Sequence, residues 1–528
     1  MRRVSSAPIA GALVPEANQL DPLHRQLYNK LREQILGGQF SAGQQMPSTR
    51  VLAADLGLSR NTVLHAFEQL KAEGYLEGAT GSGTYVARAL PEQMLQARRV
   101  IPSKKTERFL ARGWSRFGSQ ITGEGAKAIR PALFRPFQPG FPALDDFPFD
   151  TWMKLANRQR KADIGRLLGY GTARGYEPLR KAIASYLAVA RGVRCEPEQV
   201  LIVSGTQQAL DLTARLLLDP GDPVLVEEPS YRGAHAVFEA AGARLIPVPV
   251  DEHGMNLARI SISSSKASRL VYTTPSHQFP LGTTMSIARR LEWVNWAAQS
   301  GVWILEDDYD SEFRYSSRPL PALQSLDRAG CVILLGTFSK VLFPALRLGY
   351  LVAPPDLVEG FVKAKAITDF HCPLLEQALL AEFMEEGHFS RHIRRMRTLY
   401  LERLDTMLGA IRDETEGSLD IERPDAGMHV LARLGAHMDD EVIARAAASV
   451  GVSCIPLSSC YIGPGKTSGL LLGYAGYRPQ QIRLGVKKLC SVLNGQPHSR
   501  LRNRAINGFP VLKQQKTGSS ISRLTSAQ

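Results

Sequence analysis

The chain has 528 residues, 44% of them hydrophobic, and this length exceeds what one hydrophobic core usually serves, so two or three domains are expected. A formal net charge of +14 favours a polyanionic partner such as nucleic acid, although charge alone fits a generally basic protein equally well. The six cysteines form no CxxC pair and no apolar run is long enough for a membrane span, so we expect a cytoplasmic protein without a metal centre.

The N-terminal part of the chain follows the order helix, helix, turn, helix, hairpin. After residues 1–19, which we interpret as an extension and not as a signal peptide, residues 23–36 place apolar side chains at i, i+4 spacing and predict an amphipathic helix. The stretch "MPSTRVLAADLGLSRNTVLHAFEQLKAEGYLE" predicts two helices separated at "GLS" and capped by Ser48 and Ser59. The glycine-rich "YLEGATGSGTYVA" predicts a β-hairpin. Residues 20–87 therefore have the layout of a winged helix-turn-helix domain.

In this layout the second helix of the pair enters the major groove of DNA with its N-terminal residues nearest the bases. Arg60 suits bidentate contact with a guanine edge, and small hydroxyl side chains suit phosphate oxygens. The alternative is that these residues only form an exposed polar face. The candidate DNA-binding residues are Ser48, Arg50, Ser59, Arg60, Asn61, Thr62 and the wing glycines Gly81 and Gly83.

The whole string from "MPSTR" to "GTYV" closely resembles the GntR family of bacterial winged-helix regulators. The resemblance covers residues 20–87 and includes both helices and the wing. It implies specific binding to double-stranded operator DNA.

After this domain the composition and the hydrophobic pattern of the sequence change more than once. Residues 88–130 are rich in lysine, arginine, glycine and serine, and we interpret them as a basic linker. Over residues 131–495, β-rich apolar runs alternate with helical patterns, which predicts an α/β domain with a mostly parallel sheet and helices on its faces; these runs are "QVLIVSG", "PVLVEE", "RLVYTT", "VWILEDD" and "CVILLGT". Residues 496–528 are basic, polar and serine-rich, and we expect a disordered tail.

The string "GTFSKVLFPALRLGY" sets Lys340 in an apolar run, with Arg347 seven residues later. An amine with a lowered pKa in an apolar pocket is a nucleophile for a carbonyl group, and an arginine with nearby hydroxyls suits a phosphate. An aldehyde together with a phosphate describes pyridoxal 5′-phosphate (PLP), which would bind Lys340 as a Schiff base. A lone lysine is more often a surface charge, so the prediction depends on further groups.

Further groups for PLP follow the other β-rich runs. Asp307 can pair with the pyridine nitrogen, Tyr309 can reach the phenolate oxygen, and Tyr231 can stack on the ring. The turn at "SGT" opens a helix whose N-terminal N–H groups and dipole favour a phosphate. Each residue also fits a plain structural role, but their shared position beyond strand ends is where α/β sheets bind ligands. The remaining candidates are Gly205, Thr206, Gln207, Thr337 and Ser339.

Residues 134 to 490 resemble a fold type I aminotransferase, on strings that include "GYGTARGYEPLRKAIASYLAVARGV", "SGTQQALDLTARLLLDPGDPVLVEEPSY", "TPSHQFPLG" and "LEDDYDSEFRY". Joined to a GntR-type domain, this module is similar to the MocR/GabR subfamily of regulators. The resemblance implies PLP on Lys340, a small C-terminal α+β subdomain, and a head-to-tail, domain-swapped homodimer.

Two strings depart from the aminotransferase pattern. Aminotransferases usually carry "NPTG" where residues 277–282 read "HQFPLG", so the asparagine that helps to hold the phenolate oxygen is missing, and Gln278 is a candidate replacement. Near the C-terminus, Leu471 stands where an arginine usually anchors the substrate carboxylate, with Arg478 or Arg483 as possible substitutes.

The favoured function is a PLP-dependent regulator in which an amine-bearing effector, or PLP itself, alters DNA binding. Exchange of Lys340 for the effector amine, or a half-transamination, lies within the chemistry of such a domain, but steady turnover is not expected. The alternatives are an active aminotransferase with an accessory winged helix, and a repressor whose PLP domain only dimerises. The sequence names neither effector nor operator, nor does it separate activation from repression.

Overall fold

The structure is a computed structural model that describes residues 21–79, 83–90, 135–159, 164–261, 267–315, 320–415, 419–435, 437–463 and 467–495, together with the isolated residues 13, 115 and 118. The chain divides into two compact units, residues 1–113 and 114–528. The expected N-terminal extension, basic linker and C-terminal tail fall almost entirely outside the described residues.

The N-terminal unit contains the expected winged helix-turn-helix elements. The side-chain oxygens of Ser48 and Ser59 accept hydrogen bonds from the backbone N–H groups of Val51 and Thr62, so both predicted caps are confirmed. The apolar faces of the three helices pack into one buried cluster, and the hairpin pairs in antiparallel register. The elements are α2 (Leu23–Leu36), α3 (Thr49–Leu56), α4 (Arg60–Ala72), β1 (Leu76–Ala79) and β2 (Gly83–Val86).

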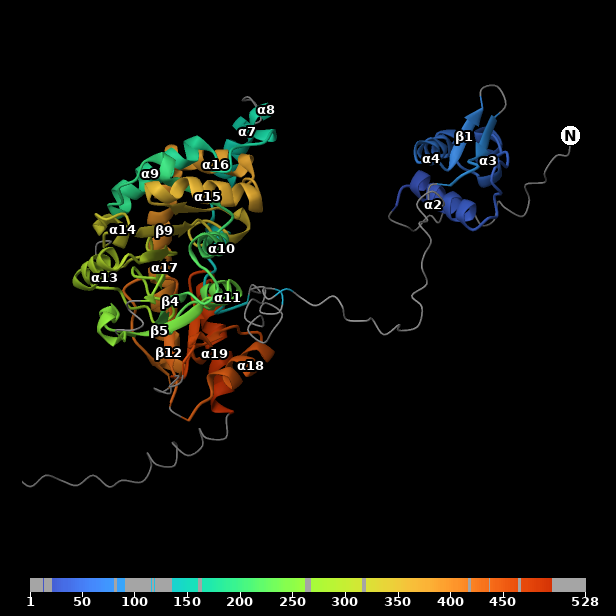
Figure 1. The fold of residues 1–528 in the computed structure, drawn as a ribbon. Coiled ribbons are helices and arrows are strands. Elements are labelled where there is room, and N and C mark those ends of the chain that lie inside the picture. The colour runs from blue at the N-terminus through green and yellow to red at the C-terminus, as the bar shows by residue number, and fades with distance from the viewer. Residues whose placement is uncertain are drawn as a thin grey trace, which may run out of the picture. The chain divides into compact units, whose positions relative to one another are not determined.

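The larger unit is built on an eight-stranded sheet with the order β3-β10-β9-β8-β7-β4-β5-β6 (Figure 1). The pairs between β9, β8, β7, β4 and β5 are parallel, as predicted, whereas β10 runs antiparallel to both β3 and β9. The strands are β3 (Val200–Val203), β4 (Pro223–Glu228), β5 (Arg244–Asp251), β6 (Gly254–Met255), β7 (Leu270–Thr273), β8 (Trp303–Asp308), β9 (Val332–Thr337) and β10 (Gly349–Val352).

Helices cover both faces of this sheet because successive strand residues point to opposite sides. One set of strand residues packs with α10 (Thr206–Leu217), α11 (Arg232–Ala240) and α15 (Pro355–Thr368). The alternate set packs with helices of the other layer. That second layer consists of α9 (Glu177–Arg191), α13 (Ile287–Ser300), α14 (Leu323–Leu326) and α16 (Leu374–Glu385), and the shorter helices α7 (Phe149–Gln159) and α8 (Ile164–Leu168) lie near α16.

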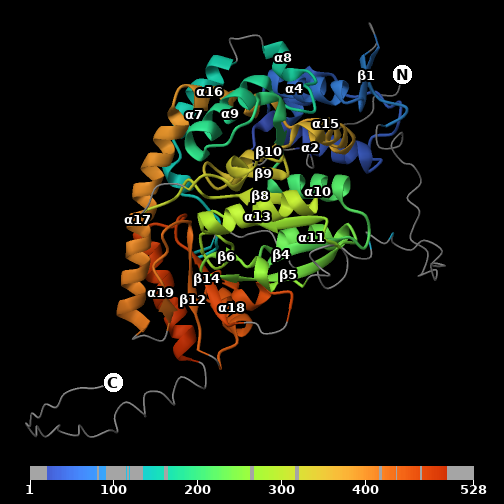
Figure 2. The same ribbon diagram turned by 60° about the vertical axis from the view of Figure 1, so that its left-hand side comes forward.

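A small α+β subdomain completes this unit, as the fold class predicts. Its four-stranded sheet has the order β11-β12-β14-β13, and the long helix α17 (His388–Thr415) runs beside both the large sheet region and this subdomain (Figure 2). The other elements are β11 (Asp420–Ile421), β12 (His429–Arg433), α18 (Asp440–Ser449), β13 (Ile455–Pro456), β14 (Gly469–Gly473) and α19 (Pro479–Asn494). Among the described residues, no helix is long and apolar enough to cross a lipid bilayer.

Candidate cofactor and DNA-binding sites

The carboxyl ends of four parallel strands deliver the predicted cofactor residues to one edge of the large sheet. Asp307 and Tyr309 come from the end of β8, Lys340 from the turn after β9, and Tyr231 from the turn after β4. Ser204 and Gly205 join β3 to α10 at the same edge. Because carboxyl ends of neighbouring strands meet there, segments distant in sequence converge.

Lys340 occupies a confined position at this edge. Its Nζ donates a hydrogen bond to the carbonyl oxygen of Gly140 at 3.1 Å. Burial lowers the pKa of the amine, while the carboxylates of Asp310 and Asp307 act in the opposite direction. Gly140 has φ +83°, a conformation that favours glycine, and a Cβ on it would lie 2.6 Å from Nζ, so the lysine amine would have to shift. Sequence reasoning missed Gly140.

Asp307 has one carboxylate oxygen paired and one free. Its Oδ2 accepts a hydrogen bond from the hydroxyl of Tyr272 at 2.9 Å, whereas Oδ1 is buried without a hydrogen-bond partner. Burial raises the pKa of this carboxyl to about 7. A buried, unpaired carboxylate oxygen is costly unless a ligand donor meets it, and a protonated ring nitrogen is such a donor.

Tyr309 is held by a histidine that sequence reasoning missed. The Tyr309 hydroxyl and His277 Nδ1 are 2.9 Å apart, and the same nitrogen lies 3.0 Å from the carboxylate of Asp310. Burial raises the pKa of Tyr309 well above its usual value. Gln278, the candidate replacement for the missing asparagine, is directed elsewhere: its amide nitrogen donates to the Pro229 carbonyl oxygen and to the carboxylate of buried Glu227.

The expected phosphate end combines a helix N-terminus with a guanidinium. Gly205 caps α10 with φ +125°, and a Cβ there would lie 3.5 Å from a terminal nitrogen of Arg347. Arg347 forms no ion pair with any described residue. This cradle of backbone N–H groups beside a free cation suits a phosphate dianion.

The other predicted residues lie around this cradle. Thr206 is the first residue of α10, and Gln207 donates its amide N–H to the carbonyl oxygen of Gly233. The Thr337 hydroxyl oxygen accepts from the backbone N–H of Ser339 at 3.2 Å and so shapes the turn before Lys340. Tyr231 keeps 37% of its surface exposed, and its ring contacts Phe279 edge-on.

These observations fit PLP. Lys340, the free oxygen of Asp307 and the Arg347 cradle would hold its carbonyl, ring nitrogen and phosphate, with Tyr309 beside the phenolate and Tyr231 over the ring. When bound, PLP would supply an electrophilic carbon and an electron sink. The chain itself supplies an amine whose pKa is lowered by burial, a carboxylate for the ring nitrogen and a phosphate cradle.

Three buried groups that could ligate a metal, those of His277, Asp310 and His429, also lie together at this edge. The Nδ1 of His277 is already shared by Asp310 and Tyr309. Its Nε2 is buried against Gly427 and has no hydrogen-bond partner among the described residues. We therefore interpret the cluster as a hydrogen-bonded support for Tyr309.

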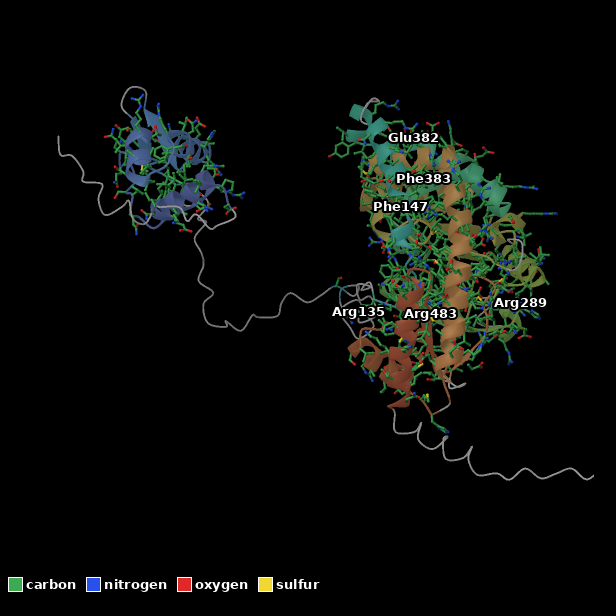
Figure 3. The ribbon with its side chains drawn as sticks, turned by 180° about the vertical axis from the view of Figure 1, so that it is seen from behind. Arg135, Phe147, Arg289, Glu382, Phe383 and Arg483 are labelled. Carbon is green, nitrogen blue, oxygen red and sulfur yellow. The ribbon has the colours of Figure 1, made fainter. Side chains whose placement is uncertain are left out.

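The carboxylate-anchor position is apolar in the structure. Leu471 is fully buried on β14, opposite Leu431 on β12. Neither proposed substitute is free to replace an arginine there: Arg478 pairs with Asp145 at 2.8 Å, and Arg483 lies exposed on α19 (Figure 3).

The N-terminal unit presents the predicted DNA-reading residues at the start of α4. Arg50, Arg60 and Asn61 are exposed. The Ser59 and Thr62 hydroxyls lie 2.8 Å apart within the helix cap, so their first role is structural. Ser48 is likewise engaged as a cap. A Cβ on wing residue Gly83 would lie 2.9 Å from Gln45, and Gly81 lies outside the described residues.

Comparison with known proteins identifies both domains. Residues 23–86 match the bacterial regulatory proteins of the gntR family, and residues 140–489 match the aminotransferase class I and II family. The chain is 43% identical to the probable rhizopine catabolism regulatory protein MocR of Rhizobium meliloti, over 89% of this chain and 93% of that protein. It is 35% identical to the HTH-type transcriptional regulator TauR of Rhodobacter capsulatus, over 74% of this chain and 80% of that protein.

Among solved structures, the chain resembles the α-aminoadipate aminotransferase LysN of Thermus thermophilus, complexed with N-(5′-phosphopyridoxyl)-L-leucine. The TM-score is 0.66 at 34% identity, over 72% of this chain and 97% of that one. The chain therefore belongs to the MocR-type transcriptional regulators, in which a GntR-type winged helix-turn-helix domain is joined to a class I and II aminotransferase domain.

Proposed function

We propose that this regulator binds PLP at Lys340 and that an amine-bearing small molecule, or PLP itself, acts at this site to change its affinity for operator DNA. The effector has this influence only if it favours one arrangement of the protein over another. If an incoming amine took the place of Lys340 on the cofactor, it would free a buried side chain next to Asp307 and Asp310, which would be a source of such a bias.

The observation that favours regulation over steady transamination is Leu471. Residues suited to the carbonyl, ring nitrogen and phosphate of PLP are present, yet an apolar side chain fills the position where an arginine usually anchors the substrate carboxylate. A site that can bind the cofactor and an amine, but lacks this anchor, suits sensing better than turnover of amino acids.

We also propose that the protein works in the cytoplasm as a head-to-tail homodimer. Support comes from exposed apolar side chains near the ends of α8 and α15: Leu168 is 68% exposed, Tyr170 92% and Ile367 87%. The rings of Tyr170 and Phe370 contact each other within this surface. Apolar groups gathered in this way are typical of a protein interface.

The proposal is tested by two measurements on the cofactor-loaded protein. Fluorescence anisotropy with DNA from upstream of the neighbouring gene should show specific, salt-sensitive binding whose affinity changes when amines are added. An assay with amino donors and keto acids should show no sustained turnover. Sustained turnover without any specific DNA binding would contradict the proposal and favour an aminotransferase.

A further inference from the structure

We propose that the effector is an amine whose remaining polar groups are uncharged, such as an amino alcohol, and that an amino acid is a poor effector. The inference rests on the proposed function and deepens it by naming a ligand class. The ligand class is inferred from the face of the four-stranded sheet that lies near the residues around Lys340.

That surface is one face of the small sheet. Along β14, Leu470 and Leu472 belong to the hydrophobic core, so the intervening Leu471 points to the opposite side. Along β12, Val430 and Ala432 likewise belong to the core. His429, Leu431 and Leu471 therefore share the second face, which we call the effector face. Arg433 lies on the same side at the opposite end of β12 from His429, where it is exposed.

The effector face lies next to the cofactor residues. The ring of His429 is 5.1 Å from His277, the partner of Tyr309, and 5.7 Å from Phe279, which contacts Tyr231. Gly473, which is opposite His429, approaches the backbone of the segment that leads to Gly140, the acceptor for Lys340 Nζ. A molecule that reaches Lys340 with its amine can thus extend toward the effector face.

The charges near this position disfavour an anionic ligand. The carboxylates of Asp307 and Asp310 both act on Lys340, and Glu227 acts on Asp307. Leu471 offers no charge, and burial lowers the pKa of His429 to about 3, so that this imidazole is neutral near pH 7. A carboxylate placed here would lose its water shell beside negative groups, whereas an ammonium group would be attracted.

His429 can nevertheless recognise a neutral polar group. Its Nε2 lies 3.4 Å from the carbonyl oxygen of Pro280, a contact in which the nitrogen is the donor. In that tautomer Nδ1 is an acceptor, and it has no hydrogen-bond partner among the described residues. A hydroxyl group of the effector is a suitable donor to it.

The inference is tested with matched pairs of probes that differ only in a carboxylate replaced by a hydroxymethyl group: L-serine with serinol, L-leucine with leucinol, and β-alanine with aminopropanol. Each is titrated into the cofactor-loaded protein, and the visible absorbance band and operator anisotropy are followed. We expect half-saturation by the amino alcohols at concentrations at least about tenfold lower. Equal or better response to the amino acids overturns the inference but leaves the proposed function standing. No response to any amine, and no change of operator affinity between the cofactor-free and cofactor-loaded protein, overturns the proposed function itself.

Leu471→Arg supplies the missing cation and should shift the preference about tenfold toward the amino acids. Leu484→Arg, at an exposed position of α19, is the matched control and should keep the wild-type preference. If thermal melting shows that Leu471→Arg does not fold, Leu431→Arg places the cation on the same face. A folded variant of this face that keeps the full wild-type preference overturns the inference.

Discussion

At the scale of single residues, the cofactor edge depends on how much room surrounds Lys340. Gly140 combines a left-handed backbone with direct contact to the lysine amine, so a methyl group there meets both backbone strain and a clash at 2.6 Å. This glycine is as much part of the site as the lysine that it faces.

We predict that Gly140→Ala weakens cofactor retention, because alanine is strained at φ +83° and the Lys340 amine must shift to make room for the methyl group. The visible absorbance of the purified protein measures this effect. Gly409→Ala on α17 is the control, because a Cβ there meets nothing within 4 Å. Wild-type absorbance in Gly140→Ala would contradict the close contact.

Asp307 gives the cofactor-free protein a pH-dependent stability. Its folded pKa of about 7 lies above the ordinary value of 3.8, so between these values the folded state holds a proton that the unfolded state has released. Stability from this group is therefore present at low pH and is lost as pH rises toward 7, by up to about 4 kcal/mol.

We predict that the Tm of the cofactor-free wild type falls more between pH 5 and pH 8 than that of Asp307→Asn, which cannot titrate. The comparison cancels the other buried carboxyls, because both proteins share them. Parallel pH profiles for the two proteins would show that Asp307 is not a buried acid with a raised pKa.

At the scale of elements, local patterns predicted the helices and strands whose burial is regular. The apolar residues at i, i+4 spacing predicted the bounds of α2, and the apolar runs predicted the positions of β3, β4, β7, β8 and β9. The antiparallel strand β10 was not assigned, although its four residues are as fully buried as those of β3 and β7.

The cofactor site was predictable from the sequence only in part, because some of its residues meet only in the folded chain. Lys340, Asp307 and Tyr231 follow strand ends, which a sequence can indicate. Gly140 meets Lys340 across 200 positions of sequence, and His277 meets Gly427 of the small subdomain, so only the folded topology brings these residues together.

The element that reads DNA is α4, whose exposed N-terminal residues include Arg60. We predict that Arg60→Ala weakens specific operator binding by roughly 1–3 kcal/mol and reduces discrimination at one base pair. Arg25→Ala, an exposed arginine on α2, removes the same charge and is the control. Anisotropy with specific and scrambled DNA distinguishes the two effects; equal losses for both variants would mean that Arg60 acts only through its charge.

At the scale of the whole molecule, the exposed apolar surface around Ile367 is the proposed dimer contact. We predict that Ile367→Glu shifts the protein toward the monomer, because a desolvated carboxylate disfavours burial in an interface. Sedimentation velocity measures the change, with Leu484→Glu on α19 as the control. A dimer of unchanged stability would place the interface elsewhere.

In the proposed function, Lys340 couples an amine-sensing site to a DNA-reading domain. The most direct test is operator binding by the wild type and by Lys340→Ala, each measured by anisotropy with and without a saturating amine. Lys363→Ala, which removes an exposed lysine paired with Glu359 on α15, is the control. We predict that the amine changes operator affinity in the wild type and in the control but not in Lys340→Ala. A full amine response in Lys340→Ala would contradict the account.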